Sequence, residues 1–336
     1  MLKNRLALCV MGATLCAAGP AFAGDGTNLM KMVPADSQIV LVFDVADARD
    51  SALLQKGYDS LLAAKPEAKA KLAEIGLDPL KDIDTVLFAG TAKGDDLDDV
   101  KNMVIIVEGR IPRDKLATVP GVKASKYLGT TIYSKEDTDV AMVGDRLFFT
   151  KVGKMKGAID IALGKGKGKG QNVVDSKKGA PLRAAVKATD TTADLWMTVL
   201  IPEKAKADMK KDKGMSANVV SIGVNFTADI KTALRIVTDS AASAANVVTM
   251  AQGQLAQVAQ MAGTFGLAKA AKSLLVSQDA ANVNISLTLT EAELQSLMKL
   301  GGLAGAAAAS PPTGAKPPGG SMAPPPPTKA TGTKTP

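Results

Sequence analysis

Glycine and lysine alternate in "LGKGKGKGQ", residues 163–171, and this stretch comes closest to a phosphate-binding loop. A P-loop requires G-x-x-x-x-G-K-[ST] after a strand, and a dinucleotide fingerprint requires G-x-G-x-x-G. Counted from Gly164, the last glycine of either pattern falls on Lys169, and the segment follows a predicted helix. We interpret it as a flexible basic connector; the alternative is weak contact with an anion or lipid surface through Lys165, Lys167 and Lys169.

Carboxylates are the other side chains in this sequence that could support catalysis or bind a metal ion. A hydrolase based on carboxylates or an oxygen-ligated metal would need several of them to converge in one cleft. A run of aspartates between residues 93 and 100 could also bind calcium, but it lacks EF-hand spacing, so a solvated hairpin tip is favoured. The candidates for the hydrolase are Asp44, Asp78, Asp82 and Asp84.

The N-terminus predicts export through a cleaved signal. Lys3 and Arg5 precede the apolar run "LALCVMGATLCAAG", and "PAFAGDG" places the cleavage after Ala23. Both cysteines lie within the signal and the chain has no histidine. The processed chain therefore cannot form disulfides, Cys/His zinc sites or Ser-His-Asp triads. We predict a periplasmic or extracellular protein with no cofactor and no catalytic residue.

Charge and composition limit the partners. The formal net charge is +8, and removal of Lys3 and Arg5 leaves +6 (8 − 2). A basic exported protein fits an anionic lipid, a cell-wall polymer or an envelope protein. Nucleic acid is not expected, because aromatic residues make up only 3% of the chain and stacking platforms need them. The apolar run of the signal is too short for a good membrane span, so no transmembrane segment is expected in the processed chain.

The order of predicted elements indicates an α+β fold, with mainly antiparallel sheets packed against helices. Strands such as "ANVNISLTLT", with one apolar and one polar face, are typical of antiparallel sheets. Two loosely similar modules are predicted, joined by a basic linker and flanked by a short lead and a Pro/Ala/Gly-rich disordered tail. The boundaries are 1–23 for the signal, 24–32 for the lead, 33–163 and 181–300 for the modules, 164–180 for the linker and 301–336 for the tail.

A long helix is predicted from about residue 240 to residue 262. Its apolar residues recur at spacings of three and four, which marks one apolar stripe. A second helix is expected near 267–276, and the region 240–275 could line a groove for a hydrophobic or lipid ligand. Packing of the stripe on the chain's own sheet is the favoured interpretation.

Two stretches carry a resemblance. "VPADSQIVLVFDV" and "GLDPLKDIDTVLFAG", followed by "VIIVEGR", resemble a loose group of exported bacterial proteins of unknown function. The resemblance covers roughly residues 33–163, and its motifs look structural. It implies export and an α+β fold, and it brings no catalytic residues.

Together these observations predict a non-enzymatic exported protein that binds a partner or belongs to the envelope. A carrier of a hydrophobic ligand and a carboxylate- or metal-dependent hydrolase are the alternatives.

Overall fold

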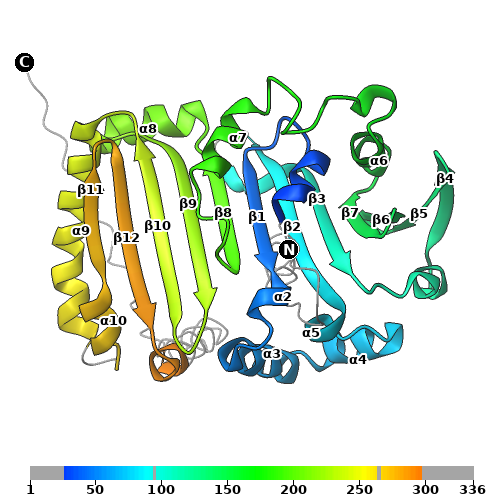
Figure 1. Cartoon of the computed structure of the whole chain (residues 1–336), viewed down its shortest axis with the longest axis horizontal. Coiled ribbons are helices and arrows are strands. Elements are labelled where there is room, and N and C mark those ends of the chain that lie inside the picture. Colours follow the sequence, from blue (N-terminus) through cyan, green and yellow to red (C-terminus); the bar gives the residue numbers. More distant parts are fainter. Residues whose placement is uncertain (1–25, 94–95, 263–265, 297–336) are drawn as a thin grey trace, which may run out of the picture. The chain divides into compact units, whose positions relative to one another are not determined.

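A computed structural model of the chain describes residues 26–93, 96–262 and 266–296. Twelve strands form one sheet in which every pairing is antiparallel, so the predicted α+β class is confirmed (Figure 1). The strands are β1 (Ile39–Asp44), β2 (Ile83–Lys93), β3 (Asp96–Gly109), β4 (Lys123–Tyr127), β5 (Thr130–Lys135), β6 (Thr138–Val143), β7 (Arg146–Lys151), β8 (Leu195–Leu200), β9 (Ala217–Phe226), β10 (Ile230–Thr238), β11 (Leu275–Asp279) and β12 (Asn282–Leu289).

Helices connect these strands and cover both faces of the sheet. They are η1 (Gly26–Met32), α2 (Val45–Ala48), α3 (Ala52–Ala64), α4 (Pro66–Ile75), α5 (Pro79–Asp82), η2 (Arg113–Thr118), α6 (Met155–Leu163), η3 (Gly166–Gly168), α7 (Ala180–Lys187), α8 (Glu203–Lys213), α9 (Ala241–Ala262) and α10 (Ala268–Ser273).

The strand order is the same in the two halves of the sheet. From the middle outward, the N-terminal half runs β1-β2-β3-β7-β6 and the C-terminal half runs β8-β9-β10-β12-β11. In each half the fourth strand of this order pairs with the third and the fifth pairs with the fourth. β5 and β4 extend only the first half. β1 pairs antiparallel with β8, so the halves share one sheet through this central pair.

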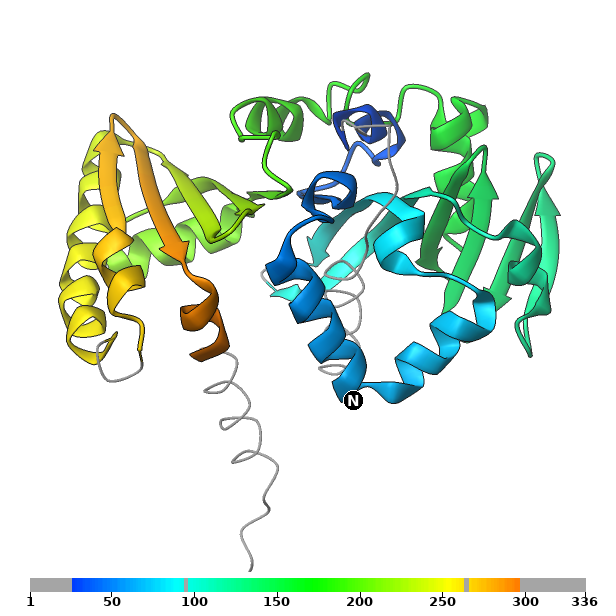
Figure 2. The ribbon, with the colours of Figure 1, turned by 60° about the horizontal axis from the view of Figure 1, so that its bottom comes forward.

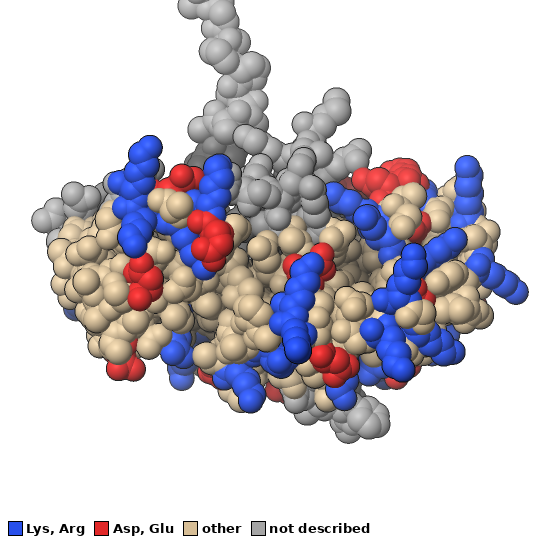
Figure 3. All heavy atoms as spheres, turned by 90° about the horizontal axis from the view of Figure 1, so that it is seen from above, with Lys and Arg blue, Asp and Glu red and all other residues tan. Residues whose placement is uncertain are grey.

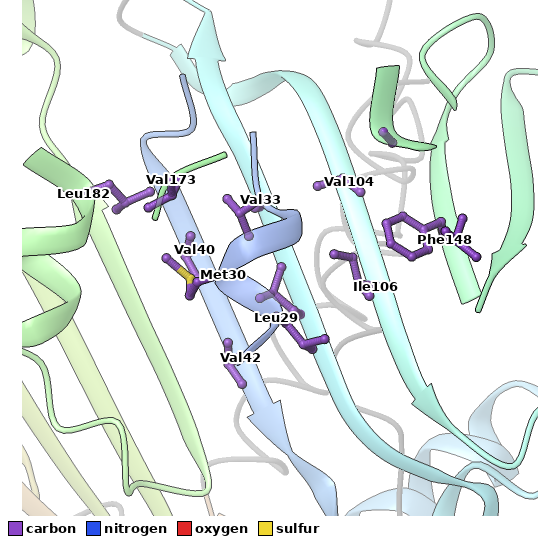
Figure 4. Close-up of a cluster of buried hydrophobic side chains, with 14 of the residues drawn as sticks. Leu29, Met30, Val33, Val40, Val42, Val104, Ile106, Phe148, Val173 and Leu182 are labelled. Atoms are coloured by element: carbon purple, nitrogen blue, oxygen red, sulfur yellow. The ribbon is translucent and has the colours of Figure 1, made fainter. Parts of the chain in front are cut away.

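One face of the sheet, face 1, carries Val40, Val42 and Trp196 and is covered by η1, α6 and α7. Figure 4 shows Leu29, Met30 and Val33 among the buried side chains of this cluster. Leu29 is fully buried, so the ordered fold begins earlier in the chain than the predicted start near residue 33. The predicted lead belongs to the core because its apolar side chains gain free energy by leaving water.

The opposite face, face 2, carries Phe43, Val86 and Val107 in the N-terminal half, where α2 and the helices that follow it lie. In the C-terminal half α9 lies along β11, β12 and β10 (Figure 2). Ala244 and Val247 of α9 pack with Val283. The small side chains of the helix stripe therefore cover the chain's own sheet.

Two elements differ from the sequence prediction. Residues 203–213 form helix α8, which is not among the predicted elements because its lysine-rich sequence shows no apolar stripe. The predicted helix at 267–276 is too long, because α10 ends at Ser273 and Leu275 begins the edge strand β11. β11 pairs with β12 along its whole length, and these inter-strand hydrogen bonds override the helical pattern.

The predicted signal at 1–23 and the predicted tail at 301–336 lie outside the described residues. Among the helices of the described ranges, none is both long enough and apolar enough to cross a membrane.

Candidate functional site

The alternating Gly/Lys segment is a packed turn at the end of α6. Gly164 ends the helix with a left-handed φ of 62°, a conformation that glycine adopts without steric cost. The Gly164 amide donates to the Ile161 carbonyl at 3.1 Å, and the Lys165 amide donates to the Asp160 carbonyl at 2.9 Å. These bonds satisfy carbonyls of the last helical turn and direct the chain back alongside α6.

Close packing requires glycine at Gly168, and a positive φ favours glycine at Gly166. A Cβ at Gly168 would lie 2.2 Å from the Asp160 carbonyl carbon, so only glycine fits there. At Gly166, which has a φ of +54°, a Cβ would lie 3.3 Å from Asp160 Oδ1. The prediction of a flexible connector is therefore wrong at residues 164–168. The glycines permit contact with α6 rather than freedom of motion.

Lys165, Lys167 and Lys169 are exposed on this turn, which we call the lysine turn (residues 164–170). Within the described ranges, no carboxylate forms an ion pair with any of the three. Figure 3 looks onto the side of the molecule where α6, α7 and α8 lie, and lysine and arginine side chains are spread over it. The three predicted contact residues are thus held together on one ordered segment.

Asp160 connects the lysine turn to the sheet. Its side chain is buried although it lies in an apolar helix, and its Oδ1 accepts a hydrogen bond from the Tyr127 hydroxyl at 2.9 Å. This bond raises the pKa of Tyr127, because the carboxylate stabilises the protonated phenol. Lys156 Nζ lies 5.5 Å from the centre of the Tyr127 ring, within cation–π range. Sequence reasoning missed Tyr127 and Asp160, although a single acid in "GAIDIAL" was a usable signal.

Each of the four carboxylates predicted for a hydrolase has a structural partner of its own. Asp78 pairs with Lys81 at 2.9 Å and caps α5. Asp84 pairs with Arg49 at 3.1 Å. Asp82 accepts a hydrogen bond from the Asp78 amide and lies near Arg110. Asp44 is at the end of β1, where it caps α2 through the Asp47 amide.

Asp44 lies next to Asp194 at the β1–β8 junction, where the Asp44 backbone amide donates to the Asp194 backbone carbonyl at 2.7 Å. Burial raises the pKa of Asp44 to about 6, and the negative charges of Asp47 and Asp194 add to the effect. Burial also raises the pKa of Asp194, whose carboxylate accepts a hydrogen bond from the Phe226 amide. Perturbed carboxylates can mark active sites, but both of these form backbone hydrogen bonds that join strands and helices.

No set of three or more metal-ligating side chains is present in the part of the chain that the structure describes. In the aspartate run, residues 94–95 lie outside the described residues, and β2 and β3 pair as far as Lys93 and Asp96.

A groove of about 540 Å³ lies over face 1 of the C-terminal half. It is hollow because small residues, among them Gly223, Ala233 and Ser286, line strands β9, β10 and β12. Arg235 lies in the groove, but its guanidinium donates to the Ala188 carbonyl and to Asn282 Oδ1. Its guanidinium thus holds the chain before β8. The lysine turn is the stronger candidate for a binding surface.

No protein-family model matches the chain, and no curated protein matches it. A solved structure entitled "Structure of crystal form I of TP0453" is similar, with 13% sequence identity and a TM-score of 0.47. The match covers 81% of this chain and 96% of that chain. The likeness is distant, and it assigns neither a family nor a function.

Proposed function

We propose that this chain is a non-enzymatic exported binding protein of the cell envelope, and that the lysine turn binds a polyanionic envelope component. One observation carries the proposal: the turn is packed so closely on α6 that Gly168 cannot bear a side chain. Residues 165–169 are therefore ordered before any partner arrives. A binding surface that is already ordered loses less conformational entropy on binding.

Charge supports the same conclusion. Lys165, Lys167 and Lys169 are exposed, and among the described residues none has an ion-pair partner. Binding a polyanion would therefore not require any existing salt bridge to break. Lysine acts as a flexible point charge rather than a bidentate fork, which suits a polymer or surface with many anionic groups better than one defined ligand.

The test is binding of a soluble polyanion, fluorescent dextran sulfate, over a series of salt concentrations. Replacement of Lys165, Lys167 and Lys169 by glutamine should weaken binding. It should also reduce the magnitude of the slope of log affinity against log salt by about 2 to 3, because each lysine contact that is lost removes about one released counterion. The matched control removes the same charge elsewhere: Lys231→Gln with Lys269→Gln and Lys272→Gln, all outside the lysine turn.

Equal losses in the two triple variants would show that only net charge matters, and the proposed site would be wrong. The non-enzymatic part of the proposal would be overturned if the purified chain showed hydrolytic turnover and if Asp44→Asn or Asp194→Asn abolished that turnover.

A further inference from the structure

Exposed apolar side chains lie beside the lysine turn. Leu128, at the tip of the β4–β5 hairpin, is 49% exposed, and Leu163, the last residue of α6, is 37% exposed. Burial of apolar surface is favourable, so a leucine left in water on an ordered segment is available for a contact.

Asp160 links the hairpin that carries Leu128 to the turn that carries the lysines. Its Oδ1 binds Tyr127, the residue before Leu128, and lies 3.3 Å from the Cβ position of Gly166. Lys165 and Lys167 flank Gly166 in the chain. The Asp160 carboxylate therefore binds the residue beside Leu128 and faces the backbone of Gly166, between these two lysines.

Helix geometry adds Leu163 to the same surface. Leu163 follows Asp160 by three residues, and residues three apart on an α-helix lie on the same side. Lys156, over the Tyr127 ring, lies on the same helix one turn earlier. We name this surface the leucine–lysine patch, and it consists of Leu128, Lys156, Leu163, Lys165 and Lys167.

The backbone at Leu128 is one that leucine rarely adopts. Its φ is 47° and that of Gly129 is 83°, so both central turn residues are left-handed. Such two-residue turns favour Asn-Gly, because a bulky side chain is strained at positive φ. Local stability thus disfavours an exposed leucine here, and an unusual conformation of this kind is a reason to look for a function.

We infer that the leucine–lysine patch docks the protein on an anionic lipid bilayer. The lysines contact the phosphate headgroups, and Leu128 and Leu163 enter the boundary between headgroups and acyl chains. The inference rests on the proposed function and names its partner. Complementary charge would attract a polymer equally, but only a bilayer also offers an apolar layer for the two leucines.

The test compares vesicle flotation with dextran sulfate binding for the purified processed chain. Vesicles contain phosphatidylglycerol and phosphatidylcholine, or phosphatidylcholine alone. The double variant Leu128→Asn with Leu163→Gln should lose about 10-fold or more in partitioning to anionic vesicles, since two buried apolar side chains are lost. It should retain polyanion binding, because its charge is unchanged.

Two controls exclude trivial explanations. Leu275→Asn removes a leucine that is 65% exposed on β11, the edge strand at the opposite end of the sheet from β4, and it should leave partitioning unchanged. Asparagine is well suited to a left-handed φ, so Leu128→Asn should keep or raise the thermal midpoint. Loss of vesicle binding in a variant of undiminished stability then reports on contact rather than on folding.

The outcomes separate the two proposals. If the double leucine variant still floats with anionic vesicles, the bilayer inference is overturned and the polyanion proposal stands. If the triple lysine variant keeps both dextran sulfate and vesicle binding, the proposed function itself fails. Equal binding of the unaltered chain to phosphatidylcholine alone would also overturn the inference, because the lysines would then have no role.

Discussion

Neutralising Asp44 should stabilise the protein at neutral pH. Burial raises the pKa of this carboxyl from its ordinary 3.8 to about 6, so the folded state favours the protonated form. Between pH 3.8 and about pH 6, Asp44 is protonated in the folded chain and has released its proton in the unfolded chain. Stability from this group is therefore complete below pH 3.8 and is lost as the pH rises through about 6.

The magnitude follows from the shift. A difference of about 2.2 (6 − 3.8) corresponds to about 3 kcal/mol at 1.36 kcal/mol per pH unit. Asp44 is only partly buried, so screening by water reduces the effect to about 1–1.5 kcal/mol. The asparagine side chain would keep the oxygen that caps α2 through the Asp47 amide, so Asp44→Asn changes the charge and little else.

The measurement is urea unfolding of the unaltered chain and of Asp44→Asn from pH 3 to pH 8. The variant should equal the unaltered protein at the acidic end and exceed it by about 1–1.5 kcal/mol above pH 7. Asp59→Asn, at an exposed position on α3, is the matched control and should show a difference that stays small and flat. A variant that is less stable at pH 8, or equally stable across the range, would refute the reasoning.

Four further predictions concern stability, each measured by the urea midpoint. Gly168→Ala should destabilise the fold by about 2 kcal/mol or more, since its Cβ would overlap the Asp160 backbone. Gly57→Ala in α3 meets nothing within 4 Å and should instead stabilise by about 0.5–1 kcal/mol, because alanine favours helix. Leu128→Asn should gain about 1 kcal/mol by relieving a φ of 47°. Arg49→Leu should cost about 2 kcal/mol or more, since it leaves Asp84, 27% exposed, without its partner. An effect smaller than that of removing the lysine from an exposed pair, such as Lys56–Glu291, would contradict this prediction.

Only part of the candidate site could be predicted from the sequence. Lys165, Lys167 and Lys169 stood out by their spacing, but glycine beside lysine is equally typical of a solvated connector. The distinction depends on the space beside α6, where the backbone at Asp160 leaves no room for a side chain at Gly168. Composition alone cannot report such a distance.

Nothing in the sequence singles out Leu128 or Tyr127 as part of a binding surface. Their relation to Asp160 spans 33 residues and depends on how β4, β5, β6 and β7 return the chain to α6. The edge strand β11 was not predicted for a similar reason. Its local sequence pattern favours a helix, and only pairing with β12 makes the segment extended.

By itself the sequence determined the α+β class, the antiparallel character and most of the strands, because alternation and helical periodicity are local properties of the chain. It also determined that the chain has no histidine, since residue types need no geometry to be counted. Only the tertiary structure decided that both halves share one sheet through β1 and β8, and that the buried carboxylate of Asp160 links the β4–β5 hairpin to the turn that follows α6. Those facts arise from contacts between residues far apart in the sequence, and the free energy of such contacts depends on packing that no local pattern encodes.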